Sequence, residues 1–477
     1  MNLAQKDSGK WIQMLLLLAS GGVVFLFVFI DALFPGMGYF LAEKYMAVPC
    51  LLFFGSALTQ RQTTSAKLSL LLSTAAVLWF AVVQMQHHLM NMGVRPFGIF
   101  AFVYLLGFPF AAVTEDGREN RGLKWIGRIY IATALIIVIG TGLLMMDAVP
   151  VDLQAVLCWD GTRTAVLWHP NRSACALLLG IGFTLYFFAE EGNKRRKILL
   201  AVLVVLQFVA LAMTNSRTSI LLACGIVGGM VFLQIWKGSL KQFLTGLVVA
   251  LAVIVLLFSV TKKLFDINSQ YRFAKLLTQI TMAEETAAEL QSEEIPEDIY
   301  LEETPEEKFE IPNVEDEGIV ISVVEESVQG GLLEDMKTLN SRTDIWGAAF
   351  EAMQDNPVIK RWGTEYVSAE ISSRIYSSVA HAHNSWIQTW IQMGTVAFLI
   401  AMVYTLVAVF NALWLIFRKH VDIGKKIVAI LVLCVLAAGF LESYLFVGEM
   451  PISFVNFIFF FCTGYLIQWN ILASVKT

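Results

Sequence analysis

Repeated apolar runs, each about 20 residues long, limit the folds that this sequence can adopt. Hydrophobic residues make up 57% of the 477 residues and charged residues only 15%. A soluble domain carries about 25% charged residues. A run of about 20 apolar residues is long enough to cross the hydrocarbon core of a bilayer as a helix. We therefore predict an all-α polytopic membrane protein.

The runs predict about twelve transmembrane helices, nine before one long hydrophilic segment and three after it. The first run is too long for a typical signal-peptide core and has no convincing cleavage site, so we expect it to remain a membrane helix. The predicted spans are residues 12–31, 38–59, 67–86, 96–114, 125–146, 172–189, 198–213, 219–236, 243–260, 386–415, 427–445 and 453–471.

The hydrophilic segment divides the chain into four parts. We predict an N-terminal membrane bundle over residues 1–260 and C-terminal membrane helices over 385–477. Residues 261–338 form an acidic segment with few aromatic residues, most acidic over 284–317, and this composition is typical of disorder. Residues 339–384 are predicted to be an ordered external loop.

The ordered loop contains a helical pattern, "SRTDIWGAAFEAMQDNP", that stops before a proline. Its large apolar residues recur at helical spacing. They are Ile345, Trp346, Ala349, Phe350 and Met353. We predict an amphipathic helix on the outer face of the bundle.

Lysine and arginine residues gather at the N-terminus and in every second loop. More than half of the 34 basic residues lie there, among them "KRRK" at 194–197. The positive-inside rule then places both termini in the cytoplasm and the 261–384 segment outside.

Polar and ionisable residues gather at the outer ends of the predicted spans rather than in their middles. Secondary transporters usually bind near the bilayer midplane, so this distribution favours an enzyme that acts from outside on a lipid-linked substrate. The residues are Asp31, Glu43, Lys44, His87, His88, Arg95, His169, Arg172, Arg217, Glu442 and Glu449.

The tetrapeptide "NSRT" occurs twice, at 215–218 and 340–343, and opens a predicted helix each time. Asn and Ser favour the N-cap, whereas an arginine in the first turn opposes the helix dipole. An arginine beside free backbone N–H groups makes a site for phosphate or diphosphate. We therefore assign Arg217 and Arg342 to catalysis. The alternative is that both reach to lipid headgroups.

The stretch "HAHNSWIQTWIQMG" at 381–394 places two histidines before a predicted span. With Asn384 or Ser385 as cap, the helix dipole favours a neutral His383, which is the form that a general base requires. His381 and His383 also suggest a metal site. No further ligand is spaced to complete a zinc set, so we predict no metal. Interfacial histidines without catalytic function remain the other alternative.

Further residues are candidates for substrate binding. Trp386 begins a tryptophan pair that forms either an interfacial belt or a sugar-stacking surface. "WHPNRSA" at 168–174 opens a span with polar side chains. The candidates are Asn384, Arg172, Asn171, Trp346, Trp386 and Arg361.

These motifs resemble the O-antigen ligase and O-antigen polymerase superfamily of bacterial membrane glycosyltransferases. In that family, a histidine and a polar residue are followed by nine residues and a glycine, as in His383-Asn384 to Gly394. An arginine before the large loop corresponds to Arg217. A second arginine, near a tryptophan in the loop, corresponds to Arg342. The resemblance covers about residues 160 to 445.

The resemblance implies a donor in which undecaprenyl diphosphate carries a glycan. The acceptor is a hydroxyl of a glycan, lipid or wall polymer, and the transfer is inverting and independent of metal. The protein would lie in the bacterial cytoplasmic membrane with its active site outside, and we expect no cofactor and no nucleic-acid partner. Whether the enzyme is a polymerase or a ligase remains open. The alternatives outside the family are a multi-span transporter of a polysaccharide or lipid-linked precursor, and a scaffold or sensor that docks partners through its acidic segment.

Overall fold

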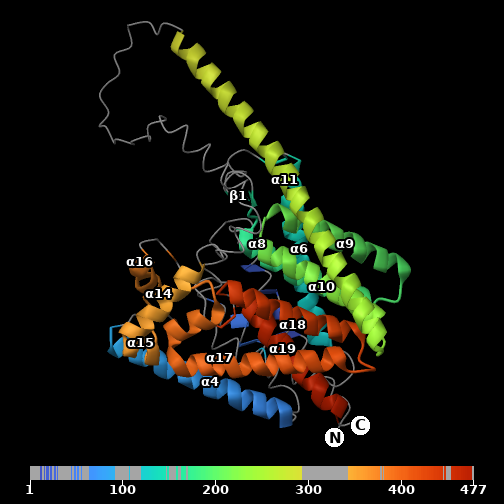
Figure 1. Ribbon diagram of the computed structural model, residues 1–477, viewed down its shortest axis with the longest axis vertical. Coiled ribbons are helices and arrows are strands. Elements are labelled where there is room, and N and C mark those ends of the chain that lie inside the picture. Colours follow the sequence, from blue (N-terminus) through green and yellow to red (C-terminus); the bar gives the residue numbers. More distant parts are fainter. Residues whose placement is uncertain are drawn as a thin grey trace.

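The computed structural model describes residues 64–91, 120–146, 163–167, 170–292, 342–375, 381–443 and 453–474, together with isolated positions elsewhere (Figure 1). In this part of the chain, seven helices are long and apolar enough to cross a membrane. They are α6 (Arg121–Met145), α8 (Pro170–Glu190), α9 (Lys194–Met213), α10 (Arg217–Ile235), α11 (Leu240–Ser292), α17 (Ser385–Phe417) and α18 (Ile423–Leu441).

Two more helices occupy predicted spans, α4 (Thr64–Leu89) and α19 (Ser453–Ser474). The other predicted spans, 12–31, 38–59 and 96–114, lie largely outside the described residues. The prediction of a helical membrane protein is therefore confirmed, whereas the count of twelve stays a prediction.

The loop before α17 folds into three short helices, α14 (Arg342–Asp355), α15 (Pro357–Trp362) and α16 (Val367–Ile375) (Figure 1). The amphipathic helix predicted here is α14, which buries Ile345, Ala349 and Met353. Asn356 ends it and caps α15, because its Oδ1 accepts hydrogen bonds from the backbone N–H groups of Val358 and Ile359. A short antiparallel pairing joins β1 (Cys158–Trp159) to β2 (Arg163–Thr164).

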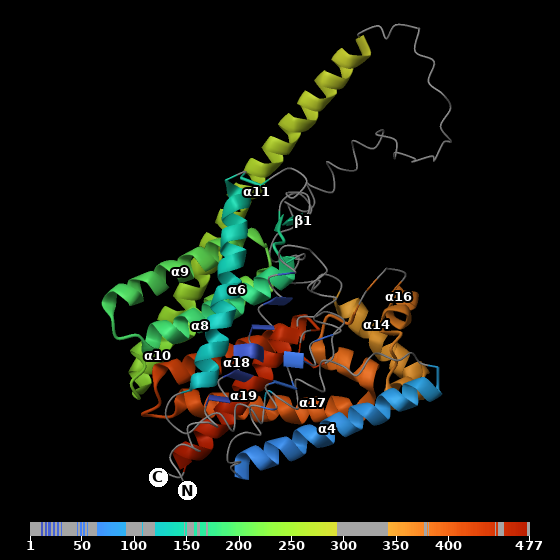
Figure 2. The same ribbon diagram turned by 180° about the vertical axis from the view of Figure 1, so that it is seen from behind.

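Helix α11 is longer than predicted. The sequence suggested a span that ends at residue 260 and disorder from 261 onward, but α11 continues to Ser292 and projects beyond the other helices (Figures 1 and 2). The residues after 260 are polar but rich in Ala, Leu, Glu, Lys and Gln, which favour helix without an apolar environment. Disorder over 293–338 lies outside the described residues and stays a prediction.

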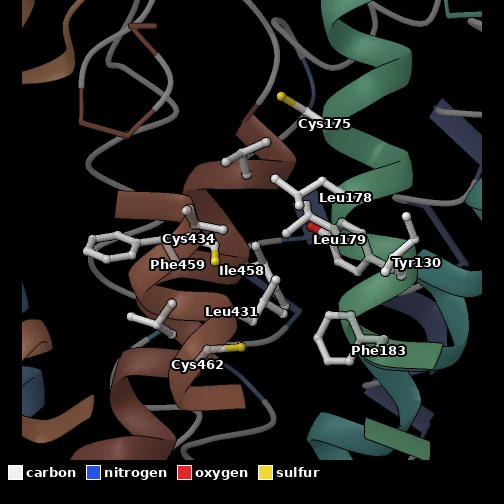
Figure 3. Packing of buried hydrophobic residues seen from close by; sticks show 14 of the residues in the cluster. Tyr130, Cys175, Leu178, Leu179, Phe183, Leu431, Cys434, Ile458, Phe459 and Cys462 are labelled. Atoms are coloured by element: carbon white, nitrogen blue, oxygen red, sulfur yellow. The ribbon is translucent and has the colours of Figure 1, made fainter. Parts of the chain in front are cut away.

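The core lies where α6, α8, α18 and α19 pack together. The Phe183 ring of α8 stacks on Tyr130 of α6 at 5.7 Å. Leu431 of α18 packs close to Gly182, where a Cβ would come within 2.7 Å of it. Figure 3 shows Leu431 facing the Phe183 side of α8. This close packing fixes the positions of the ends of α8 and α18.

Helices α8 and α18 are antiparallel, so the start of one lies near the end of the other. At one face of the bundle, Lys124 Nζ lies 3.7 Å from Glu190 Oε2 at the end of α8. A Cβ on Gly424, near the start of α18, would meet the same Glu190 side chain. The start of α8 and the end of α18 must therefore meet at the opposite face.

The loop crosses α17 at a backbone contact that only glycine permits. A Cβ on Gly363 would overlap the carbonyl of Gln392, and a Cβ on Gly394 would overlap the carbonyl of Arg361. Both glycines have positive φ, 83° and 79°. Thr364 N donates to Ile391 O at 2.9 Å across the same contact. The crossing attaches the loop to α17 and gives Gly394 of the family motif a physical role.

A Gly363→Ala variant is expected to lose about 3 kcal/mol of stability or more, because it combines a left-handed backbone with overlap against a carbonyl. The thermal unfolding midpoint in detergent measures this loss. Gly347→Ala is the matched control, since nothing lies within 4 Å of a Cβ there. Equal midpoints for the two variants would contradict the assigned role of the crossing.

Candidate functional site

Four helix ends meet around one carboxylate, that of Glu442, which directly follows α18. Its Oε2 lies 3.2 Å from Nδ1 of His383, before the start of α17. Its Oε1 accepts a hydrogen bond from Arg342 Nη2 at 3.0 Å, at the start of α14. The same oxygen accepts one from Asn171 Nδ2 at 3.3 Å, at the start of α8. We call Asn171, Arg342, His383 and Glu442 the Glu442 cluster.

The backbone beside Glu442 is tied to the start of α17. Ser385 Oγ donates to the carbonyl of Glu442 at 2.8 Å and accepts from Leu445 N at 3.1 Å. Asn384 N donates to Ser443 Oγ at 3.2 Å. These bonds hold His383 and Glu442 in one local frame, although the two residues lie 59 positions apart in the chain.

Glu442 is buried and charged. Only 6% of the residue is exposed. Burial raises the pKa of its carboxyl, but the hydrogen bond and charge of His383 and the charges of Arg342 and His381 outweigh it, so the pKa lies below its ordinary value. Glu442 is therefore an anion at neutral pH and compensates the charge of Arg342.

The contact with Glu442 sets the orientation of His383. An ionised carboxylate can only accept, so it favours the tautomer with hydrogen on Nδ1 and leaves the lone pair on Nε2. The side chain is 31% exposed, whereas that of Glu442 is 8% exposed. In this tautomer, an imidazole held through Nδ1 by a buried carboxylate, with a lone pair on Nε2, is arranged as a general base.

The turn that carries His383 has an unusual backbone. His383 has φ 47°, in the left-handed region, and its N–H donates to His381 Nδ1 at 3.2 Å. The two imidazole centroids lie 4.0 Å apart. The turn therefore packs His381 against His383 and directs the two side chains toward Glu442.

His381, His383 and Glu442 place three possible metal-ligating atoms within 4.8 Å of one another. Two of these residues already have other hydrogen-bond partners. Arg342 donates to Glu442, and the His381 Nδ1 lone pair accepts from the His383 backbone. A cation would have to displace the guanidinium or lie beside its positive charge. These three side chains therefore fit a cluster in which Arg342 balances the negative charge of Glu442 better than they fit a metal site.

Asn384 is the N-cap of α17, and it is one of the two residues that the sequence offered for this position. Its Oδ1 accepts from the N–H groups of Trp386 and Ile387, each at 3.0 Å. Its Nδ2 donates to Phe440 O at 3.1 Å. The residue is 6% exposed and its amide is used within the protein, so the structure assigns it a capping role, and substrate binding by Asn384 stays a prediction.

Trp386 is also engaged in contacts within the protein. It is 4% exposed, its ring stacks on Phe440 at 4.1 Å, and its Nε1 donates to Thr405 Oγ1 at 2.9 Å. These contacts bury the ring, and sugar stacking by Trp386 stays a prediction. Trp346 contacts the turn that carries His383, where its Nε1 donates to the carbonyl of Ala382 at 3.0 Å.

Arg217 is the first residue of α10, and Ser216 is in the N-cap position. The start of α10 lies against the start of α8, since Cys175 Sγ is 4.0 Å from Ser219 Oγ. Arg217 is therefore at the same face of the bundle as Asn171 and Arg172. In the second copy of the tetrapeptide, Arg342 opens α14 as predicted, and residues 340–341 lie outside the described part.

Arg361 is not brought to the Glu442 cluster by any described contact. It is exposed, with its guanidinium 5.4 Å from the centroid of the Trp362 ring. Its carbonyl packs against Gly394, about 15 Å along α17 from His383. His169 lies outside the described residues.

Glu442 is the site residue that the sequence analysis did not identify. It was grouped with the polar residues at outer helix ends but received no role. A usable signal was present, because an acid directly after an apolar span must have a partner if it is buried. Its partners could not be named, because they lie on other helices.

Comparison with known proteins relates part of the chain to one family. Residues 202–402 match the model of the family described as O-antigen ligase. No curated protein matches the sequence. The matched segment includes Arg217, Arg342 and His383. The match over residues 202–402 supports the resemblance of this part of the membrane protein to the O-antigen ligase superfamily.

Proposed function

We propose that this protein transfers a glycan from an undecaprenyl-diphosphate carrier to an acceptor hydroxyl at the outer face of the bacterial cytoplasmic membrane. The observation that carries the proposal is the buried contact between His383 and Glu442, 3.2 Å long, beside Arg342. It joins a base, its orienting carboxylate and a cation at one end of a membrane bundle.

His383 is the proposed general base. The acceptor oxygen attacks the anomeric carbon, and its proton passes to Nε2 of His383. The bond between the anomeric carbon and the diphosphate oxygen breaks, and the electron pair leaves with the diphosphate. Glu442 stabilises the imidazolium that forms, as a buried carboxylate does in a catalytic triad. One displacement inverts the anomeric centre.

Guanidinium groups are the proposed stabilisers of the leaving diphosphate. Arg217 lies at the N-terminus of α10, where backbone N–H groups and the helix dipole also favour an anion. Arg342 is bonded to Glu442 through Nη2, while its buried Nε has no hydrogen-bond partner among the described residues. Arg172 is a further candidate for substrate contact at the start of α8. Fixed arginines would supply the charge that a metal supplies in other transferases.

An Arg217→Lys variant is expected to lose roughly 10- to 100-fold in kcat/KM, because an ammonium cannot reproduce the two-pronged contact to phosphate. Transfer assays with purified protein measure the loss. Arg195→Lys is the control, since Arg195 is exposed on α9. Full turnover by Arg217→Lys would count against a bidentate diphosphate role.

The distribution of charge supports the proposed orientation. The cluster lies where α8, α14 and α17 begin and α18 ends, whereas Lys124 and the start of α18 lie at the opposite face. Basic residues in the alternate loops favour the cytoplasmic side for that opposite face, and both termini with it.

A transfer assay in detergent tests the proposal against transport. Purified protein is mixed with lipid-diphosphate-linked glycan and acceptor in the presence of a chelator. We expect a larger glycan product, because transfer needs neither a sealed compartment nor a metal. A ladder of repeat units would identify a polymerase, and a single capping step a ligase. An intact donor in the presence of acceptor would favour the transporter.

A further inference from the structure

A row of buried polar side chains leads from the external loop to the turn that carries His383. Glu365 follows α15, and Gln392 and Gln388 lie one turn apart on α17. Gln392 Nε2 donates to Glu365 Oε2 at 2.9 Å, and Gln388 Nε2 donates to Gln392 Oε1 at 2.9 Å. The row ends where Ala382 N donates to Gln388 Oε1 at 2.8 Å.

These side chains are withdrawn from solvent. Gln388 is 0% exposed, Gln392 is 1% exposed and the Glu365 side chain is 6% exposed. Burying an amide costs free energy unless it is hydrogen-bonded. Apolar residues would fill the same positions without that cost, so a fully bonded polar row suggests a specific role.

The two ends of the row fix its direction. The Ala382 N–H can only donate and an ionised carboxylate at Glu365 can only accept. Each glutamine between them must therefore present oxygen toward Ala382 and nitrogen toward Glu365. Gln84 of α4 donates to Glu365 Oε1 at 2.9 Å, so the carboxylate receives a second amide donor from another helix. Only one assignment of the amide oxygens and nitrogens gives every hydrogen bond in the row a donor and an acceptor.

The row holds one side of the catalytic turn and Trp346 holds the other. The Ala382 N–H is bonded to Gln388, and the Ala382 carbonyl accepts from Trp346 Nε1 at 3.0 Å. The next residue, His383, has the left-handed φ of 47°. The two peptide units on either side of Ala382 are thus both hydrogen-bonded directly before a left-handed residue, and this determines where the imidazole points.

We propose that Glu365, Gln392 and Gln388 are positioning residues that fix His383 for proton transfer and couple the external loop to the base. This inference rests on the proposed function, because it concerns catalysis only if His383 is the base. The position of the turn itself can be measured without activity.

The first test replaces Gln388 by Met, which is similar in size and provides no good acceptor for the Ala382 N–H. We expect kcat to fall about 10- to 100-fold, because a small displacement of a catalytic group has that effect, while KM for the donor stays within about twofold. Thr389→Val is the matched control. Thr389 is the next residue and is 0% exposed, and among the described residues its hydroxyl bonds only within its own helix, to Ser385 O. Equal kcat values for the two variants would overturn the proposal.

A charge exchange provides a second test that does not depend on one variant. In Gln388→Glu, the carboxylate at residue 388 can only accept hydrogen bonds. Gln392 must therefore turn its amide nitrogen toward residue 388 and its amide oxygen toward Glu365. That oxygen and the Glu365 carboxylate are both acceptors, so the bond between Gln392 and Glu365 is lost. Adding Glu365→Gln supplies a donor there and restores every bond in the row. We expect low kcat in the single variant and recovery to at least about one third of wild type in the double variant. Equal activity of the single and double variants would contradict the positioning role of the row.

Carbethoxylation of His383 by diethyl pyrocarbonate, followed by mass spectrometry, separates this inference from the proposed function. We expect the rate at His383 to change at least twofold in Gln388→Met and to stay unchanged in Thr389→Val. If His383→Ala keeps transfer but this rate change occurs, the row positions the turn and the assigned base is wrong. An unchanged rate would show that the row does not position the turn.

Discussion

A His383→Asn variant is expected to lose about 10²- to 10⁴-fold in kcat, which is the contribution of a positioned general base. Asparagine tolerates the left-handed backbone at this position, so the fold should persist. Its amide can still donate toward Glu442 but cannot take a proton from the acceptor. The loss should appear in kcat with little change in the thermal unfolding midpoint.

His420→Asn is the control for this variant. His420 also has positive φ, at 66°, but is exposed in the connection between the end of α17 and the start of α18, whereas the cluster lies at the other ends of these two helices. It should retain wild-type transfer. If His383→Asn transferred glycan as fast as His420→Asn, His383 would be an interfacial residue and the base would lie elsewhere.

A Glu442→Gln variant is expected to lose both activity and stability. Removing the carboxylate leaves the mostly buried guanidinium of Arg342 without its counter-charge, which costs about 3 kcal/mol. It also removes the group that sets the His383 tautomer, so kcat should fall by about 10²-fold or more. Thermal unfolding and transfer assays measure the two effects separately.

The stability effect of Glu442 should depend on pH in a defined direction. The folded-state pKa of its carboxyl lies below the ordinary value, so its contribution is fully present above the unfolded pKa of about 4.3. It is lost as pH falls through the folded value. The midpoint difference between wild type and Glu442→Gln should thus be constant near neutral pH and shrink only in acid.

Asp422→Asn is the control, because Asp422 lies at the other end of α18 and makes no capping bond with its side chain. Its midpoint should stay close to that of wild type. A Glu442→Gln protein with the same midpoint and activity as Asp422→Asn would show that the carboxylate neither compensates Arg342 nor orients His383.

Local features of this protein were predictable from sequence, because their causes are local. The cap at Asn384 and the starts of α10 and α14 follow from side-chain chemistry and helical spacing within a few residues. Most described spans also lie within a few residues of their apolar runs.

Features that depend on distant parts of the chain were not predictable in this way. The partner of His383 lies 59 residues away, and no periodic pattern connects the two. Trp386 looked like a surface aromatic because it follows a polar turn, but Phe440 covers its ring. The polar residues after position 260 suggested a loop, whereas helix propensity alone continues α11.

The most direct test measures both products of the reaction in a single turnover of the wild-type protein. Purified protein in excess is given undecaprenyl-diphosphate-linked glycan and acceptor, with a chelator present. We predict that free undecaprenyl diphosphate and glycosylated acceptor appear at the same rate and in equal amounts. A donor that stays intact, or free lipid diphosphate without glycosylated acceptor, would contradict glycan transfer by this site.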